Sequence, residues 1–443
     1  MIRRIDARTA EGRAALESLR ATLSAGQGMI SGETAPVDVE TSVRRILDSI
    51  RKRGDTAVCE WTHKLDGVAL RPETLRVPEE TIEAAYRAMP KEFIQTVTRV
   101  REAVRRFQRY VLPRERKPLS REGRTLRLVH RPMSRVGVYV PGGKAFYPST
   151  VLMTAVPALS AGVPEVAVAC PPTSDGDIAR SVLAVCRVAG VSEVYRMGGV
   201  QAIAAMAYGT ATVRPVEKIV GPGNTYVQLA KKLVFGRVAI DSFAGPSEVV
   251  VLADSSADAG LVAADMLSQV EHDPGSAILV TPDAALAAAV VKEIEKQTAG
   301  MKRADAIRSA LEKYSAVVVV TDMDAAAEII NGLAPEHLEI QTENPEDVLR
   351  SIRSAGAVFL GRYTPVAVGD YVAGPSHTLP TGGTARWASG LTARDFLRSM
   401  SVIEYDREAL AADAEDVLRL AEVEGFPAHA ASVRKRLETE PRP

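Results

Sequence analysis

The sequence predicts an α/β fold built from two doubly wound modules in tandem, with a helical N-terminal region and a helical C-terminal tail. From about residue 135 to residue 360, short apolar runs of strand length alternate with segments of helical periodicity. The strand-like runs are almost continuously apolar, which is typical of a parallel sheet covered by helices on both faces. Glycine clusters follow several of these runs and precede helices, as in α/β sheets that bind ligands there.

The composition is that of a globular protein without net charge. Of the 443 residues, 46% are hydrophobic and 25% are charged, and Lys+Arg and Asp+Glu both number 55. This balance gives no field that would attract nucleic acid or an anionic membrane, so we expect neither as a partner. The cysteines Cys59, Cys170 and Cys186 share no metal or redox spacing, and the N-terminus lacks the apolar stretch of a signal peptide. We therefore expect a cytoplasmic protein.

The first third of the chain is predicted to be helical. Apolar residues recur at helical spacing after Asp38, a candidate N-cap, and Gly54 suits the C-terminal stop. A second amphipathic helix is predicted over residues 91–111, with arginines on its outer face. Residues 113–124 are polar and are predicted to form a connector.

Two runs of strand–helix units follow. The strands of the first run are predicted at residues 136–140, 165–170, 193–197 and 218–220, and Ser149 is a candidate helix cap between the first two. The strands of the second run are predicted at residues 248–252, 277–281, 316–320, 338–341 and 357–360. After Asp395 the chain is predicted to continue as a charged helical tail.

One helix of the second run carries a polar pair on its last turn. Gln269 and His272 are three residues apart, so a helix that begins near Asp258 places both on one face, and Pro274 stops it soon after. An amide oxygen and a neutral imidazole can both ligate a divalent metal. The alternative is a helix C-terminus with a favourably placed histidine.

Further candidates lie in loops of the second run and in the tail. Glu336 and His337 are adjacent, and a carboxylate beside an imidazole suits water activation followed by proton removal, although a solvated loop pair is the alternative. Asp370 lies in a glycine-flanked turn, where it can reach inward or close an Asx turn. His429 follows Glu424 in the tail, where a lone histidine is usually a surface residue. His377 is a further candidate in the second module.

The glycine clusters at residues 141–143, 198–199 and 221–224 suggest a nucleotide site. Each follows a predicted strand and leads to a helix N-terminus, whose N–H groups can accept a diphosphate. None completes the dinucleotide fingerprint, since Tyr226 stands where the last glycine of the third cluster should be. Simple turn glycines are the alternative.

Nine blocks of the sequence resemble the histidinol dehydrogenase family. Among them are GPGNTYV at residues 221–227, QVEHD at 269–273 and APEHLEI at 334–340. The other blocks lie at residues 139–144, 147–153, 198–204, 244–248, 369–374 and 377–383. The similarity is continuous from about Arg44 to His429.

The resemblance implies an enzyme of histidine biosynthesis that oxidises L-histidinol to L-histidine. It would use one Zn2+ per subunit and reduce two NAD+, passing through an aldehyde that is not released. The implied zinc ligands are Gln269, His272, Asp370 and His429. The implied substrate contacts are Ser247, Gln269, His272, His337, Asp370, Glu424 and His429.

The resemblance also implies roles for single residues. His337 would take the alcohol proton and Glu336 would activate water, as an acid/base pair. The nucleotide would lie near Tyr139, Gln201 and Asn224. The family forms a homodimer in which the tail crosses to the partner, so His429 and Glu424 would serve the neighbouring site.

A domain division follows from the two modules and the resemblance. Residues 1–24 are expected to be an N-terminal arm, and residues 135–247 an incomplete Rossmann-like, NAD-binding domain. Residues 25–134 and 248–390 are expected to form the zinc and substrate domain. Residues 391–443 would be the tail that contributes to the partner's site.

Three other functions are compatible with parts of the sequence. A dehydrogenase of the same family could act on another alcohol, such as a sulfonated propanediol, and the sequence departs from the family pattern at Ser376 and Val270. A zinc hydrolase would use Glu336 to activate metal-bound water, but it gives no role to Tyr139, Gln201 or Asn224. A non-catalytic binding protein would not need every chemical position of the family to be filled.

Overall fold

A computed structural model describes residues 2–31, 37–142, 146–242, 245–271 and 275–438. The chain splits into two compact units. The first contains Met1–Val111 and Ser134–Phe396, and the second contains Leu112–Met133 and Leu397–Pro443. Within the described residues, no helix is both long and apolar enough to cross a membrane.

The first module contains a five-stranded parallel sheet in the order β6-β5-β4-β7-β8. Its strands are β4 (Arg135–Tyr139), β5 (Glu165–Cys170), β6 (Glu193–Arg196), β7 (Lys218–Val220) and β8 (Ala239–Ile240). The chain winds outward from β4 through β5 and β6 and then returns to the other side of β4 through β7 and β8. This is the doubly wound order, in which ligand sites form beside the central strand.

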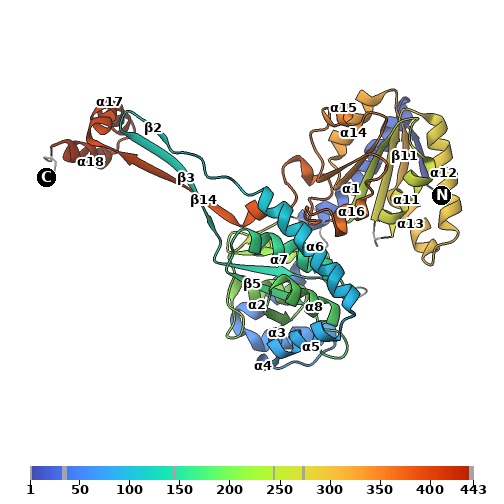
Figure 1. Cartoon of the computed structure of the whole chain (residues 1–443), viewed down its shortest axis with the longest axis horizontal. Helices are drawn as coiled ribbons and strands as arrows, with labels where there is room; N and C mark the ends of the chain where they lie inside the picture. Colours follow the sequence, from blue (N-terminus) through green and yellow to red (C-terminus); the bar gives the residue numbers. More distant parts are fainter. Residues whose placement is uncertain (1, 32–36, 143–145, 243–244, 272–274, 439–443) are drawn as a thin grey trace. The chain divides into compact units, whose positions relative to one another are not determined.

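The helices of residues 37–110 pack with those of residues 148–234 in this first module (Figure 1). The helices are α2 (Val37–Arg53), α3 (Asp55–Asp66), α4 (Pro72–Leu75), α5 (Glu79–Ala88), α6 (Lys91–Tyr110), α7 (Pro148–Ser160), α8 (Arg180–Ala189), α9 (Gly199–Tyr208) and α10 (Thr225–Val234). Val43 and Ile50 of α2 share one apolar core with Tyr139 and Ala167 of the sheet. The helices α2 to α6 thus pack against elements of the first module.

The second module contains a six-stranded sheet in the order β1-β11-β10-β9-β12-β13, and all its strand pairs are parallel. Its strands are β1 (Arg3–Asp6), β9 (Ser247–Ala253), β10 (Gly275–Thr281), β11 (Ala316–Val319), β12 (His337–Gln341) and β13 (Ala357–Leu360). From β9 to β13 the winding repeats that of the first sheet. The segment expected as an N-terminal arm instead supplies the edge strand β1 and the start of α1 (Ala10–Ser31).

The two faces of this sheet bury separate cores. Val249 and Val251 of β9 face α11 (Ala259–Val270), α12 (Ala284–Thr298) and α13 (Ala304–Tyr314). Val250 and Leu252 face α1, α14 (Met323–Leu333) and α15 (Pro345–Leu349), together with Leu338 of β12. Because side chains alternate along a strand, the odd-numbered residues of β12 point to the α11 face.

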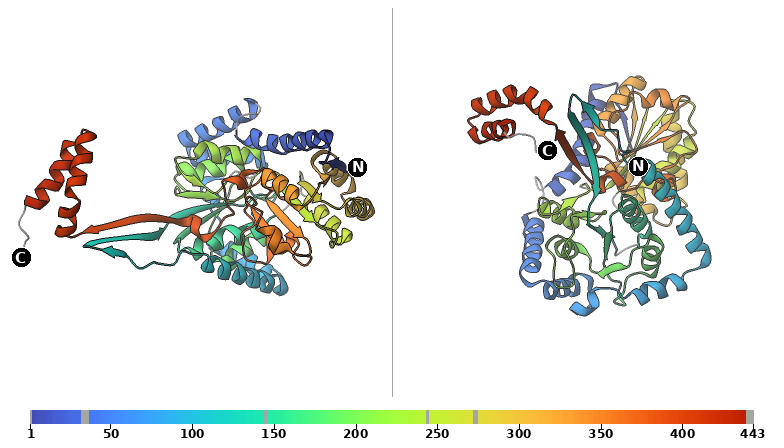
Figure 2. Two further views of the ribbon diagram at one scale, coloured as in Figure 1. Left: turned by 90° about the horizontal axis from the view of Figure 1, so that it is seen from above. Right: turned by 60° about the vertical axis from the view of Figure 1, so that its left-hand side comes forward.

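The second unit combines an antiparallel sheet with two helices. The sheet has the order β14-β3-β2, with β2 (Leu119–Arg121), β3 (Arg124–Pro132) and β14 (Leu397–Tyr405). The helices α17 (Arg407–Val423) and α18 (Pro427–Glu438) pack side by side at its end (Figures 1 and 2). Residues 113–124, predicted as a polar connector, thus include β2, and the predicted helical tail consists of β14 followed by the two helices.

Two predicted helix caps were also wrong. Asp38 lies inside α2, which begins at Val37, and Ser149 lies inside α7. Pro148 takes the first position of α7 and Tyr147 precedes it as the N-cap. A proline suits that position because its N–H would have no helical partner.

Candidate active site

A cluster of polar side chains lies where β9 and β12 begin. Ser247 is the first residue of β9 and His337 is the first residue of β12, and the two strands are neighbours in the sheet. These side chains therefore gather at the amino ends of the strands, whereas ligands of α/β sheets usually bind at the carboxyl ends.

The carboxyl group of Glu336 is held by two donors. Its Oε2 accepts a hydrogen bond from the hydroxyl of Ser247 at 2.7 Å and another from the backbone N–H of Glu248 at 3.0 Å. Glu336 is buried, and burial raises the pKa of its carboxyl group to about 8 against the effect of these donors. The group is therefore fixed in place and poised to exchange a proton near neutral pH.

His337 is oriented so that one ring nitrogen remains available. Its Nδ1 lies 3.0 Å from the backbone oxygen of Glu248, so Nδ1–H donates and Nε2 carries the lone pair. Nε2 is buried without a hydrogen-bond partner among the described residues, 3.8 Å from Oδ1 of Asp370. Burial lowers the pKa of His337, so the ring is neutral at pH 7. A neutral imidazole with a free Nε2 can take a proton.

Glu248 organises this pair and was missed in the sequence. Its backbone N–H holds the carboxyl group of Glu336, and its backbone oxygen holds the ring of His337. Its Oε1 accepts hydrogen bonds from the N–H groups of Glu336 at 3.3 Å and Gly382 at 2.8 Å. Burial, with the nearby Glu336, raises the pKa of Glu248 to about 7. The only signal in the sequence was a glutamate at the start of an otherwise apolar strand.

Two of the predicted zinc ligands belong to this cluster. Gln269 lies buried on the last turn of α11 and donates a hydrogen bond from Nε2 to the hydroxyl of Ser247. Asp370 lies in α16 (Val366–Tyr371) rather than in a turn, and its backbone oxygen is 3.1 Å from Nδ1 of His377. The structure thus brings Ser247, Gln269, Glu336, His337 and Asp370 together.

Three further predicted site residues are not part of this cluster as described. His272 falls outside the described residues. Glu424 is the C-cap of α17 and His429 lies in the first turn of α18, both exposed on the second unit. The ring of His429 is 5.2 Å from that of Phe426.

The donor types of the predicted set suit zinc. One amide oxygen, one carboxylate and two imidazoles form a borderline donor set of the kind that Zn2+ accepts. The unpartnered Nε2 of His337 beside Asp370 shows hydrogen-bonding capacity that the described residues leave unused. Among those residues, no group of three or more His, Cys, Asp and Glu side chains could hold a metal by itself.

The residues predicted to lie near a nucleotide are found at the carboxyl end of the first sheet. The hydroxyl of Tyr139, at the end of β4, accepts a hydrogen bond from the N–H of Gly199 at 3.1 Å. Gln201 is fully buried in α9, and its Nε2 donates to Asp66 at 3.1 Å. Burial raises the pKa of Asp66, a residue the sequence did not single out, to about 6.

Asn224 has a structural partner in the same region. It is the N-cap of α10, and its Oδ1 accepts a hydrogen bond from the N–H of Val227 at 3.1 Å. The preceding Gly221 has a φ of 122°, and a Cβ at this position would meet the backbone oxygen of Tyr139. The N-terminus of α10 is thus held close to the end of β4, which suits an anion-binding turn.

Comparison with known proteins identifies the family. The family model for histidinol dehydrogenase matches residues 31–437. The chain is 50% identical to the histidinol dehydrogenase of Rhodopirellula baltica over 404 residues, covering 91% of this chain and 87% of that protein. It is 48% identical to that of a Synechococcus species, covering 92% and 94%.

A solved structure agrees with the sequence comparisons. The crystal structure of histidinol dehydrogenase from Elizabethkingia anophelis superposes with a TM-score of 0.88 at 34% identity, covering 91% of this chain and 93% of that one. A doubly wound α/β fold was predicted, and this likeness confirms it. The chain belongs to the histidinol dehydrogenase family.

Proposed function

We propose that this protein is a histidinol dehydrogenase that oxidises L-histidinol to L-histidine, in the last steps of histidine biosynthesis. One observation carries the proposal. The buried pair Glu336–His337 is held by Glu248 so that Nε2 of a neutral imidazole faces Asp370 and has no hydrogen-bond partner within the described part of the chain. A base of this kind is what the oxidation of an alcohol requires.

In the first oxidation, Nε2 of His337 takes the hydroxyl proton of the substrate while a hydride leaves the adjacent carbon. Bound zinc supplies Lewis-acid positioning of the substrate, and NAD+ supplies the hydride acceptor. Gln269, His272, Asp370 and His429 would hold the zinc, and Tyr139, Gln201 and Asn224 would lie near the nucleotide. The bond between Nδ1–H and the backbone of Glu248 keeps His337 in the tautomer that can accept the proton.

In the second oxidation, Glu336 acts on water. The ionised carboxylate removes a proton from a water molecule as it adds to the aldehyde, and the hydrate then loses the second hydride. The donors Ser247 and Glu248 favour the charged carboxylate and fix its direction. Burial opposes ionisation, so this step is expected to become faster as the pH rises toward about 8.

The departure at Ser376 gives no support to a different substrate. Its hydroxyl donates a hydrogen bond to the backbone oxygen of Met153 at 2.7 Å and accepts one from the N–H of Thr378 at 3.1 Å. Ser376 is buried and both of its bonds are to backbone groups. Histidinol therefore remains the proposed substrate, with a sulfonated propanediol as the alternative within the family.

We also propose that the protein is a cytoplasmic homodimer in which the second unit serves the partner's site. This unit exposes a run of large apolar side chains, which a monomer would leave in water. They are Leu119, Leu126, Leu128, Met400, Ile403, Leu420, Val423 and Phe426. Glu424 and His429 are exposed on the same unit, where Glu424 would bind the substrate imidazole. The free, buried cysteines fit a reducing compartment.

The test is NADH formation from L-histidinol and NAD+, followed to completion with and without a chelator. We expect two NADH per histidinol, loss of the reaction on chelation and its return with zinc. A sulfonated propanediol serves as the control substrate. Turnover of that diol without turnover of histidinol would replace the proposed substrate, and product formation without NAD+ would indicate a hydrolase.

A further inference from the structure

A second buried polar cluster lies behind the candidate active site. It consists of Asp265 on α11 with Glu339 and Gln341 on β12, and none of the roles above involves it. Glu339 is 1% exposed and Gln341 is 6% exposed. Both follow His337 on the same face of β12, at intervals of two residues. On the neighbouring strand β9, the same face of the sheet is filled by Val249 and Val251.

The three side chains of this cluster are bonded to one another. Nε2 of Gln341 donates to Oδ2 of Asp265 at 2.7 Å and to Oε2 of Glu339 at 2.9 Å. The carboxyl groups of Asp265 and Glu339 also lie within hydrogen-bonding reach of each other. Burial, together with Asp265, raises the pKa of Glu339 to about 8.

The cluster joins α11, β12 and α16, three of the elements that carry the candidate active site. Oε1 of Glu339 accepts a hydrogen bond from the N–H of Val366 at 3.0 Å, which is the first residue of α16. Asp370 lies one turn later on that helix. Asp265 lies one turn before Gln269 on α11, and its bonds to Gln341 and Glu339 tie this helix to β12.

We propose that Asp265, Glu339 and Gln341 are positioning residues, which fix Gln269 and Asp370 relative to His337. The proposal rests on the proposed function, because it assigns Gln269 and Asp370 to a zinc site. Apolar packing fills space between helix and strand but does not fix direction, whereas the hydrogen bonds from Gln341 to Asp265 and from Val366 to Glu339 are directional. Here they set the position of α11 and the direction of the first N–H of α16.

The test compares zinc affinity among three variants of the full-length protein by competition with a chromogenic chelator. Glu339→Gln keeps an oxygen for the N–H of Val366, and it exchanges the acceptor for Gln341 for an N–H that can donate to Asp265. Glu339→Leu removes the bonds to Val366 and Gln341 at similar volume. Leu183→Ala, on α8 of the first module, is the control for general loss of stability, since Leu183 is buried far along the chain from these elements.

We expect Glu339→Leu to weaken zinc binding about 10- to 100-fold, as loss of an outer-shell partner does. Glu339→Gln should bind zinc within about threefold of the wild type, and Leu183→Ala should leave the affinity unchanged. Equal affinity in the wild type and Glu339→Leu would overturn the proposal. If Glu339→Leu does not fold, Gln341→Met, which removes both bonds from the amide, replaces it under the same criterion.

A second measurement separates this proposal from the proposed function. Amide hydrogen exchange over residues 366–371 reports directly on the N-terminus of α16, with or without metal. We expect faster exchange there in Glu339→Leu, and wild-type exchange in Glu339→Gln and Leu183→Ala. If the wild type binds no zinc, the proposed metal site fails, and the exchange result alone decides the positioning role. Unchanged exchange in Glu339→Leu would contradict it.

Discussion

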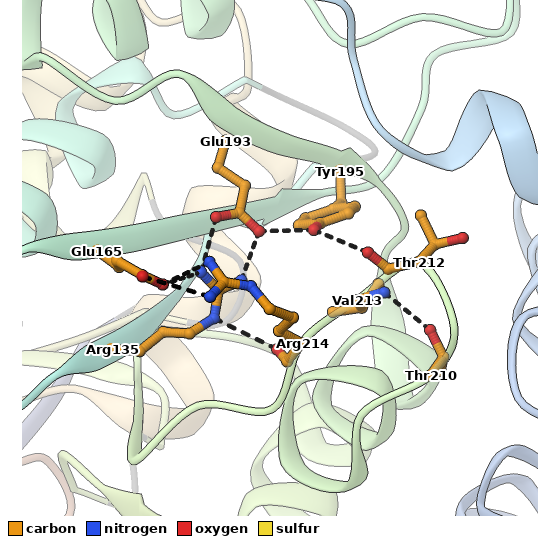
Figure 3. Close-up of polar contacts among 8 residues, drawn as sticks. All are labelled: Arg135, Glu165, Glu193, Tyr195, Thr210, Thr212, Val213 and Arg214. Carbon is orange, nitrogen blue, oxygen red and sulfur yellow. Dashed lines mark hydrogen bonds and ion pairs between the residues drawn. The ribbon is translucent and has the colours of Figure 1, made fainter.

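The two sheets have the same winding order, but the charged groups at their amino ends differ in whether they have partners of opposite charge. In the first sheet, Arg135, Glu165 and Glu193 open β4, β5 and β6 (Figure 3). Nη1 of Arg135 lies 2.9 Å from Glu165 and 2.7 Å from Glu193. Tyr195 donates a further hydrogen bond to Glu193 at 2.6 Å. Each buried charge has a partner of opposite sign.

In the second sheet, the described partners of Glu336 and Glu248 are hydroxyl groups, amide groups and each other. Burial raises the pKa values of these two acids to about 8 and about 7. In the first sheet, burial also acts to raise the pKa of Glu193, but the hydrogen bond from Arg135 holds it below its ordinary value. At the amino end of the first sheet, matched charges stabilise the structure. At the amino end of the second sheet, unmatched acids have raised pKa values, as acids in active sites often do.

The largest effect is expected from removing the base. His337→Ala should lower kcat by up to about 10⁴-fold, because Nε2 of His337 is the proposed acceptor of the alcohol proton. The variant also loses the hydrogen bond from Nδ1–H to the backbone oxygen of Glu248, so its stability to urea is measured alongside. Single-turnover NADH formation from histidinol measures the effect, with Glu165→Gln as the variant from the other sheet. A loss smaller than about tenfold would remove His337 from the chemistry.

Arg135→Met should lower the stability of the protein and leave kcat nearly unchanged. It leaves Glu193 buried without its cation, which typically costs about 3–5 kcal/mol of stability. The kcat of the folded fraction should stay within about twofold of the wild type, because Arg135 does not contact the second module's cluster. Urea unfolding measures the loss of stability, and activity without denaturant measures kcat. A large loss of kcat without loss of stability would contradict the assignment of a purely stabilising role to the charges of the first sheet.

Glu336→Gln should impair the second oxidation more than the first. Removing a general base costs about 10²-fold or more. In the wild type, NAD-dependent oxidation of supplied histidinaldehyde should rise with pH through about 8, because the raised pKa keeps Glu336 protonated below that value and the base form is needed. In Glu336→Gln this rise should be absent. A pH profile identical in both proteins would mean that another group activates water.

The smallest effect is expected from Glu248→Gln. The amide oxygen can still accept the N–H groups of Glu336 and Gly382, and both backbone contacts of residue 248 persist. We expect kcat to fall by no more than about tenfold, the scale of one hydrogen bond. Glu248→Ala, which loses the acceptor, should fall further. If the two variants are equal, the side chain does not position the pair and the backbone alone does.

The elements of both modules were predictable because their signal is local. The strands β4, β5, β9 and β10 are buried apolar runs, and periodicity alone detects them. The strands β3 and β14 were missed because they lie in the second unit with many exposed side chains, such as Leu128 and Ile403, so they have no buried face to reveal. The packing of α2 on the first sheet depends on long-range contacts that no window of sequence contains.

The chemistry of the site was predictable by residue type but not by place. Gln269, Glu336, His337 and Asp370 were singled out, and the structure groups them. Their position at the amino ends of β9 and β12 reverses the usual rule for α/β sheets. Glu248 was missed because half of its contacts are made by its backbone, which a residue's identity does not disclose.

The edge strand β1 sets a constraint on biosynthesis. Arg3 of β1 pairs with Ala316 of β11, so β1 must wait for a partner that is synthesised much later. Meanwhile residues 37–242 can complete the first module, since domains fold as units during synthesis. Until β1 docks, β11 presents an open edge that can pair with other chains. The docking of β1 thus closes one edge of the second sheet, and a fusion placed directly before β1 would load this long-range pairing.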